Sequence, residues 1–156
     1  MTFPATFGGP TLLGGVRVLL VDDHRPTLRV LAAVLERSGA RATIAESAAQ
    51  ADEILGRDGA DVLVCDVTMP GEDGYQFIRR LRGRESGGRL PALALTAHAG
   101  AQDRDLAIVA GFDRHLPKPV DPAVLVAAIA DMLGRSGGGT REAGPSGTPE
   151  PAATDG

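Results

Sequence analysis

Side chains that could handle metal ions and phosphate recur at similar places along this chain, each just after a short apolar run. Three of them are carboxylates, one is a hydroxyl and one is an ammonium group. The five residues are Asp22, Asp23, Asp66, Thr96 and Lys118. Carboxylates packed together repel one another, so at neutral pH they need a cation or raised pKa values. A hard divalent cation with oxygen ligands meets this need, and Mg²⁺ is the simplest choice.

The same set could carry out phosphoryl transfer. Magnesium keeps several waters and also binds phosphate oxygens. Lys118 would supply a point charge for a phosphate oxygen and Thr96 a hydrogen-bond donor. A carboxylate can act as a nucleophile and form an aspartyl-phosphate. This chemistry needs neither a Ser-His-Asp triad nor a glycine-rich phosphate loop, and the sequence contains neither.

These side chains would meet if the apolar runs before them were parallel strands of one sheet. Residues 16–21, 62–65 and 92–95 are nearly continuous apolar runs, as in strands buried on both faces. Residues 41–45 and 115–116 predict a weaker strand and a very short one. Because ligands bind at the carboxyl ends of the strands in such sheets, the five polar residues would share one edge.

The segments between and after these strands have helical apolar spacing, which predicts five helices. Ser47 and Gln50 have the spacing of a capping box at the start of one of them. The fourth helix is expected to be short and to end at Gly111, and its apolar spacing comes from Leu106, Val109 and Ala110. Strands and helices in alternation predict an α/β fold with a doubly wound five-stranded parallel sheet.

Length and composition indicate one folded domain with loose ends. The chain has 156 residues, and we expect a flexible segment over 1–15, the domain over 16–134 and a disordered Gly/Pro-rich tail over 135–156. A net charge of −4 argues against a general nucleic-acid binder. The single cysteine rules out an intrachain disulfide framework. We expect a cytoplasmic protein, since no apolar run is long enough for a bilayer and the first residues lack a signal peptide's basic region.

Four motifs together resemble the response-regulator receiver domain of two-component signalling, over about residues 16–134. They are Val21-Asp22-Asp23, Cys65-Asp66-Val67-Thr68-Met69-Pro70-Gly71-Glu72-Asp73-Gly74, Leu95-Thr96-Ala97 and Leu116-Pro117-Lys118-Pro119. The resemblance implies a flavodoxin-like sheet with strand order 2-1-3-4-5. It also implies that Asp66 accepts a phosphoryl group from a phosphohistidine on a sensor kinase or a histidine-phosphotransfer protein.

The resemblance assigns roles to the residues around Asp66. Asp23, Asp66 and the backbone carbonyl of Thr68 would ligate Mg²⁺, with Asp22 acting mainly through water. Thr96 and Lys118 would contact the phosphoryl group, and the peptide bond after Lys118 would be cis. The domain would assist its own phosphorylation and dephosphorylation without being an enzyme in the usual sense.

The family is also similar to a two-state switch, and here the sequence departs from its pattern. Thr96 would move toward the phosphoryl group while a Tyr or Phe three residues before the lysine rotates inward, but this chain has His115 there. A histidine at this place is similar to receiver segments of hybrid sensor histidine kinases, which suggests a multistep phosphorelay. Thr68 and His98 would tune the lifetime of the phosphoryl group.

We expect a single-domain regulator without a DNA-binding output. A downstream protein would contact the face formed by the fourth helix, the fifth strand and the fifth helix.

Two other functions stay open. A pseudo-receiver would keep the fold as an interaction module without phosphorylation, although such domains usually lose acidic or acceptor residues. A cobalamin-binding module is suggested by residues 22–27, which partly resemble an Asp-x-His-x-x-Gly signature. In this chain Thr27 stands where that signature has glycine, and Asp66, Thr96 and Lys118 would have no role.

Overall fold

A five-stranded parallel sheet forms the centre of the domain. The computed structural model describes residues 12–84, 90–97 and 100–134. The strand order is β2-β1-β3-β4-β5, so the flavodoxin-like prediction is confirmed. The strands are β1 (Arg17–Val21), β2 (Arg41–Ala45), β3 (Val62–Asp66), β4 (Ala92–Thr96) and β5 (Arg114–Pro117).

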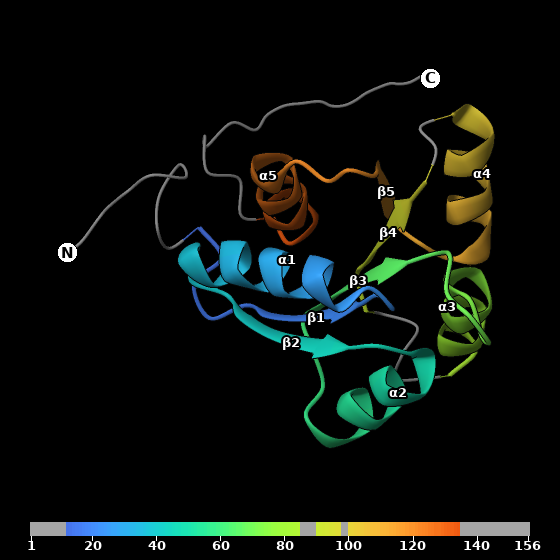
Figure 1. The fold of residues 1–156 in the computed structure, drawn as a ribbon, viewed down its shortest axis with the longest axis horizontal. Helices are drawn as coiled ribbons and strands as arrows, with labels where there is room; N and C mark the ends of the chain where they lie inside the picture. The colour runs from blue at the N-terminus through green and yellow to red at the C-terminus, as the bar shows by residue number, and fades with distance from the viewer. Residues whose placement is uncertain (1–11, 85–89, 98–99, 135–156) are drawn as a thin grey trace.

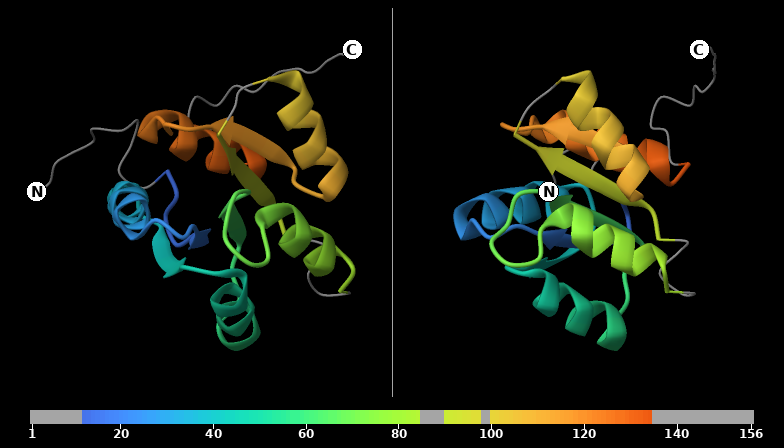
Figure 2. Two further views of the ribbon diagram at one scale, coloured as in Figure 1. Left: turned by 45° about the vertical axis from the view of Figure 1, so that its right-hand side comes forward. Right: turned by 90° about the vertical axis from the view of Figure 1, so that its right-hand side faces the viewer.

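Helices cover both faces of this sheet, as Figures 1 and 2 show. They are α1 (Arg25–Arg37), α2 (Ala48–Arg57), α3 (Gly74–Arg82), α4 (Ala101–Ala110) and α5 (Pro122–Met132). The buried side chains of α1 and α5 pack in one cluster, and those of α2, α3 and α4 pack in another. Among the described residues, no helix is long and apolar enough to cross a membrane.

The strands hold the two clusters together because their side chains alternate between the faces. Leu20 and Val64 point into the cluster of α1 and α5, whereas Leu19 and Leu63 point into the other. Every residue of β3 and β4 is buried, as the continuous apolar runs predicted. The core is largely aliphatic, with Phe77 as its largest fully buried side chain.

The folded part of the chain begins before the predicted boundary at residue 16. Leu13 is fully buried, and its N–H donates to the carbonyl of Ser38 over 2.8 Å. The prediction of a flexible first segment therefore does not hold for residues 12–15, because Leu13 packs in the core with residues from distant parts of the chain. Residues 1–11 and the predicted tail over 135–156 lie outside the described residues.

Helix α4 exists as predicted, but of the three apolar residues that indicated it only Ala110 is buried. Ala107 and Ala110 are its buried side chains, whereas Leu106 is 47% exposed and Val109 is 82% exposed. Apolar spacing along a helix does not say which of two stripes meets the sheet. Here the small alanines contact the core, and the larger side chains lie in solvent.

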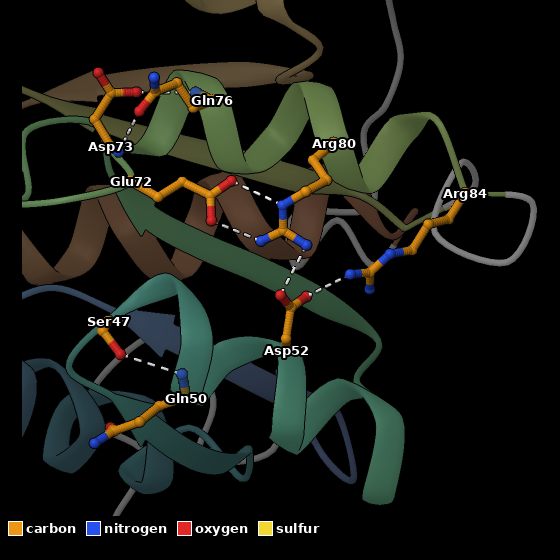
Figure 3. A network of polar contacts seen from close by, with 8 residues as sticks. All are labelled: Ser47, Gln50, Asp52, Glu72, Asp73, Gln76, Arg80 and Arg84. Atoms are coloured by element: carbon orange, nitrogen blue, oxygen red, sulfur yellow. Dashed lines mark hydrogen bonds and ion pairs between the residues drawn. The ribbon is translucent and has the colours of Figure 1, made fainter.

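The capping box lies at a different helix from the one predicted. Ser47 does accept from the N–H of Gln50, but the Gln50 side chain bonds the N–H of Glu46, one residue too early for a reciprocal pair. At α3 the reciprocal pair is present: Asp73 accepts from the N–H of Gln76 over 2.9 Å, and Gln76 from the N–H of Asp73 over 3.0 Å (Figure 3). Helix α3, which follows the acceptor candidate Asp66, therefore begins at a firmly defined residue.

Candidate functional site

The carboxyl ends of four strands bring the predicted site residues to one edge of the sheet. Strands β1 and β3 are neighbours, with Val21 opposite Cys65. Asp22 follows the first of these residues and Asp66 the second, so the two carboxylates lie side by side. Parallel pairing of local apolar runs thus places polar residues together that are far apart in the sequence.

Three carboxylates form the centre of the site. Asp22 and Asp66 are 1% and 4% exposed, whereas Asp23 lies at the surface. One oxygen from each of the three lies within 4.8 Å of the others. Backbone N–H groups hold the two buried carboxylates: that of His24 donates to Asp22 Oδ1 over 2.9 Å, and that of Thr68 to Asp66 Oδ1 over 3.2 Å.

Lys118 reaches both buried carboxylates. Its Nζ lies 3.1 Å from Asp22 Oδ2 and 3.3 Å from Asp66 Oδ2. Burial by itself lowers the pKa of Lys118, but the hydrogen bond and charge of Asp22, together with Asp66, outweigh it and raise the pKa above its usual value. The ammonium group is therefore charged at neutral pH.

Asp66 keeps a raised pKa in spite of this lysine. Burial is the largest cause, and the negative charge of Asp22 adds to it. The N–H of Thr68 and the charge of Lys118 lower the pKa of Asp66, but they do not cancel the other two effects. One ammonium group is too little positive charge for three neighbouring carboxylates. A set of hard oxygen donors with excess negative charge fits a divalent cation such as Mg²⁺.

Thr96 and the lysine loop complete this edge. Thr96 ends β4 and is 1% exposed, and its carbonyl accepts from the N–H of Lys118 over 2.7 Å. The bond between Lys118 and Pro119 is cis, as the resemblance implied. His115 is half-buried in β5 opposite Ala94. Its role in switching stays a prediction, and His98 lies outside the described residues.

Gly74, the first residue of α3, packs closely against the end of β3, a contact that the sequence alone did not predict. Its N–H donates to the carbonyl of Val67 over 3.1 Å. A Cβ at this position would lie 2.5 Å from the carbonyl oxygen of Asp66 and 2.7 Å from Cα of Val67. No larger residue fits without moving the backbone next to Asp66. A glycine at the first position of a helix, directly after the N-cap Asp73, could have indicated this contact, because most side chains are tolerated at that position.

A hollow of about 610 Å³ lies beside Lys118, and sequence reasoning missed it as well. Pro26 and Val30 of α1 line one side, and Lys118 and Val120 line another. Val30 is 59% exposed although it is a large aliphatic residue. The lining is mainly apolar, so the charged site opens beside a surface suited to an apolar side chain of another molecule.

The fold and the site define an α/β protein with an acidic pocket and a lysine at the carboxyl end of its sheet. The family model for the response regulator receiver domain matches residues 18–130. The chain belongs to this family of two-component signalling proteins.

Individual relatives agree with this assignment. An uncharacterised 14.6 kDa protein from the sodA1 3′ region of Leptolyngbya boryana is 42% identical over 117 residues, which cover 75% of this chain and 89% of that protein. Hybrid signal transduction histidine kinase D of Dictyostelium discoideum is 34% identical over 138 residues, which cover 83% of this chain but only 9% of the kinase. A crystal structure of a protein assigned as a response regulator in Chloroflexus aurantiacus J-10-fl aligns with a TM-score of 0.74 and 32% identity, over 77% of this chain and 98% of that one.

Proposed function

We propose that this chain is a phosphoacceptor that receives a phosphoryl group on Asp66 from a phosphohistidine of a sensor kinase or a phosphotransfer protein. The observation that carries the proposal is the contact of Lys118 with both Asp66 and Asp22 at the strand ends. An oxygen of Asp66 forms the new bond to phosphorus as the phosphorus–nitrogen bond of the donor breaks. The donor's imidazole nitrogen keeps the electron pair, and water later releases inorganic phosphate and restores the carboxylate.

The neighbouring residues stabilise the added charge. Lys118 lies 3.3 Å from Asp66, where it can contact a phosphoryl oxygen, and Thr96 ends the adjacent strand as a hydroxyl donor. Mg²⁺ would be held by Asp23, Asp66 and the backbone carbonyl of Thr68, with Asp22 bound through water. The ion would neutralise charge on the carboxylates and on the phosphoryl oxygens. Positioning and charge neutralisation then account for most of the rate, so the domain assists a reaction without acting as an enzyme on a separate substrate.

Two surfaces of the domain are proposed to contact partner proteins. The hollow beside Lys118 offers apolar contact next to Asp66, where the donor protein must lie to bring its phosphohistidine within reach. A downstream protein would contact the face of α4, β5 and α5. The exposed Leu106, Ile108 and Val109 support this choice, since three large aliphatic side chains on one helix favour a protein partner.

Signalling through this face requires a change at the site to reach it. Thr96 would move toward the phosphoryl group, and His115 would change its side-chain position in β5. The similarity to a hybrid histidine kinase supports a place in a multistep phosphorelay. We propose that this relay operates in the cytoplasm.

The test is phosphorylation by a small donor. The protein is incubated with Mg²⁺ and acetyl phosphate, and its intact mass is measured with Asp66→Asn as the control. We expect a gain of about 80 Da in the wild type, and no gain in the variant or without Mg²⁺. No gain under conditions that label another receiver domain would contradict the proposal and favour a phosphorylation-independent interaction module.

A further inference from the structure

A four-residue ionic network lies beside the loop that follows Asp66, and the function proposed above gives it no role (Figure 3). Nε and an Nη atom of Arg80 in α3 donate to the two carboxylate oxygens of Glu72 over 2.8 and 2.7 Å. The other Nη atom lies 2.8 Å from Asp52 of α2, and Arg84 lies 2.9 Å from the second oxygen of Asp52. One guanidinium group therefore joins the loop, α2 and α3.

Glu72 belongs to the loop that carries part of the candidate site. This loop runs over 67–73, between the end of β3 and the start of α3. At its first end the N–H of Thr68 bonds Asp66, and at its last end Gly74 bonds the carbonyl of Val67. Between these ends, Glu72 is ion-paired with Arg80 of α3. Arg80 in turn pairs with Asp52 of α2, so the loop is connected to α2 only through this arginine.

Contacts with Phe77 and Glu72 fix the position of the Arg80 side chain. Its side chain is 37% exposed, and its Cζ lies 5.5 Å from the ring centre of the buried Phe77. Bidentate pairing fixes the plane of the guanidinium as well as its distance from the carboxylate. A single flexible ion pair at the surface would hold the loop far less firmly.

We propose that Arg80 is a positioning residue for cation binding at Asp66, because it pairs with Glu72 and with Asp52 of α2 and thereby fixes the loop from which Thr68 offers its backbone carbonyl. This inference rests on the proposed function, since it concerns the Mg²⁺ that phosphorylation of Asp66 requires. Arg80 itself does not touch the ion or the phosphoryl group.

A purely electrostatic role for Arg80 predicts the opposite outcome. Removal of a positive charge near an acidic pocket, with Glu72 left unpaired, makes the field more negative and strengthens cation binding. Loss of a positioning contact frees the loop and weakens cation binding, because the ion must then order the loop as it binds. The sign of the change in Mg²⁺ affinity separates the two roles.

The experiment measures the dissociation constant for Mg²⁺ by isothermal titration calorimetry in the full-length chain. We expect Arg80→Met to weaken binding about fivefold, which corresponds to about 1 kcal/mol. Arg79→Met is the matched control, since Arg79 is an exposed arginine in the same helix. It removes the same charge but no contact to the loop, so its affinity should equal that of the wild type or slightly exceed it.

Two further variants test the pairing itself. Arg80→Lys keeps the charge but cannot pair bidentately, so we expect a loss between those of wild type and Arg80→Met. Adding Arg80→Met to Glu72→Gln should weaken binding no further than Glu72→Gln alone does, since both changes release the same loop contact. Circular dichroism checks folding, and if Arg80→Met is unfolded, Arg80→Lys, which keeps the charge, decides the matter.

The outcomes separate this inference from the proposed function. A wild-type protein that binds no Mg²⁺ overturns both. A wild-type protein that binds Mg²⁺ and is phosphorylated, with unchanged or tighter binding in Arg80→Met, overturns the positioning role and leaves the acceptor function intact. Additive losses in the double variant would also overturn it.

Discussion

The two ends of the sheet differ in how their charged side chains are paired. At the carboxyl end, Asp22 and Asp66 are buried beside each other, and both contact Lys118. A third carboxylate, that of the exposed Asp23, lies next to them. At the amino end, Arg82 donates to the carbonyls of Gly111 and Leu90 and to the carboxylate of Asp113.

The amino end pairs opposite charges and satisfies the backbone at the same time. Asp113 also accepts from the N–H of Ala92 at the start of β4, so one arginine and one aspartate connect α3 with β4 and β5. A second pair, Arg17 and Asp61, joins the starts of β1 and β3 with N–O distances of 2.8 to 3.3 Å.

The difference teaches where this fold is stabilised and where it is prepared for reaction. Paired charges with satisfied hydrogen bonds contribute to a single native structure. Like charges held together raise the energy of the empty site, which a cation or phosphoryl group can then lower. Changes at the amino end should therefore alter stability, and changes at the carboxyl end should alter the rate of phosphorylation.

The largest expected effect is on the phosphorylation rate of a carboxyl-end variant. Lys118→Met removes the ammonium group that faces Asp66, so transfer from acetyl phosphate should slow about a hundredfold at saturating Mg²⁺. The rate is measured by intact mass against time, with Arg82→Met as the matched control from the amino end. A fall of less than about threefold would mean that the two ends do not differ as described.

Arg82→Met gives the converse test. Loss of its contacts to two carbonyls and to Asp113 leaves partly buried acceptors without their donor, so the free energy of unfolding should fall by about 2 kcal/mol. Urea denaturation measures this change, and the rate of Asp66 labelling should stay at the wild-type value. A stable variant with slow labelling would reverse the assignment of the two ends.

Magnesium should stabilise the protein through the carboxyl end alone. At ten times its dissociation constant, a ligand that binds only the folded state adds about 1.4 kcal/mol to the free energy of unfolding. Arg82→Met should keep this gain, and Asp23→Asn should lose most of it. Equal gains in all three proteins would place the ion elsewhere.

The smallest expected effect is on the pH dependence of the metal-free protein. Burial raises the pKa of Asp66, so the folded state binds this proton more tightly than the unfolded state does. Its contribution to stability is present below the ordinary carboxyl pKa and is lost as the pH rises through the raised pKa of Asp66.

Asp66→Asn should therefore be more stable than the wild type at neutral pH in the presence of a chelator. Its advantage should disappear as the pH falls below the ordinary carboxyl range. Thermal unfolding across this pH range gives the comparison. A variant that is less stable than the wild type at neutral pH would contradict the cost of burying the Asp66 carboxylate beside Asp22.

Much of the site could be predicted from the sequence because its residues follow local patterns. Each apolar run predicts a buried strand, and parallel strands end at one edge. The proximity of Asp22, Asp66 and Lys118 follows from these two statements, and their distances confirm it.

Local patterns were insufficient where two equivalent choices existed or where a distant partner decided. Leu106 and Val109 showed that α4 is a helix, but only packing on the sheet decided that the alanines face inward. The sequence around Leu13 predicts a loose segment, but the burial of this residue and the hydrogen bond from its N–H to the carbonyl of Ser38 depend on a distant part of the chain.

What the sequence by itself determined is the order of strands and helices and the kinds of residue at the strand ends. The spacing of apolar residues predicts where the strands and helices lie, and the residues that follow each strand are read directly from the chain; both are local properties. Only the tertiary structure decided that Arg80 of α3 would lie between Glu72 of the loop and Asp52 of α2 and pair with both. Such contacts depend on the distance between elements that pack from remote parts of the chain, and no local pattern carries that distance.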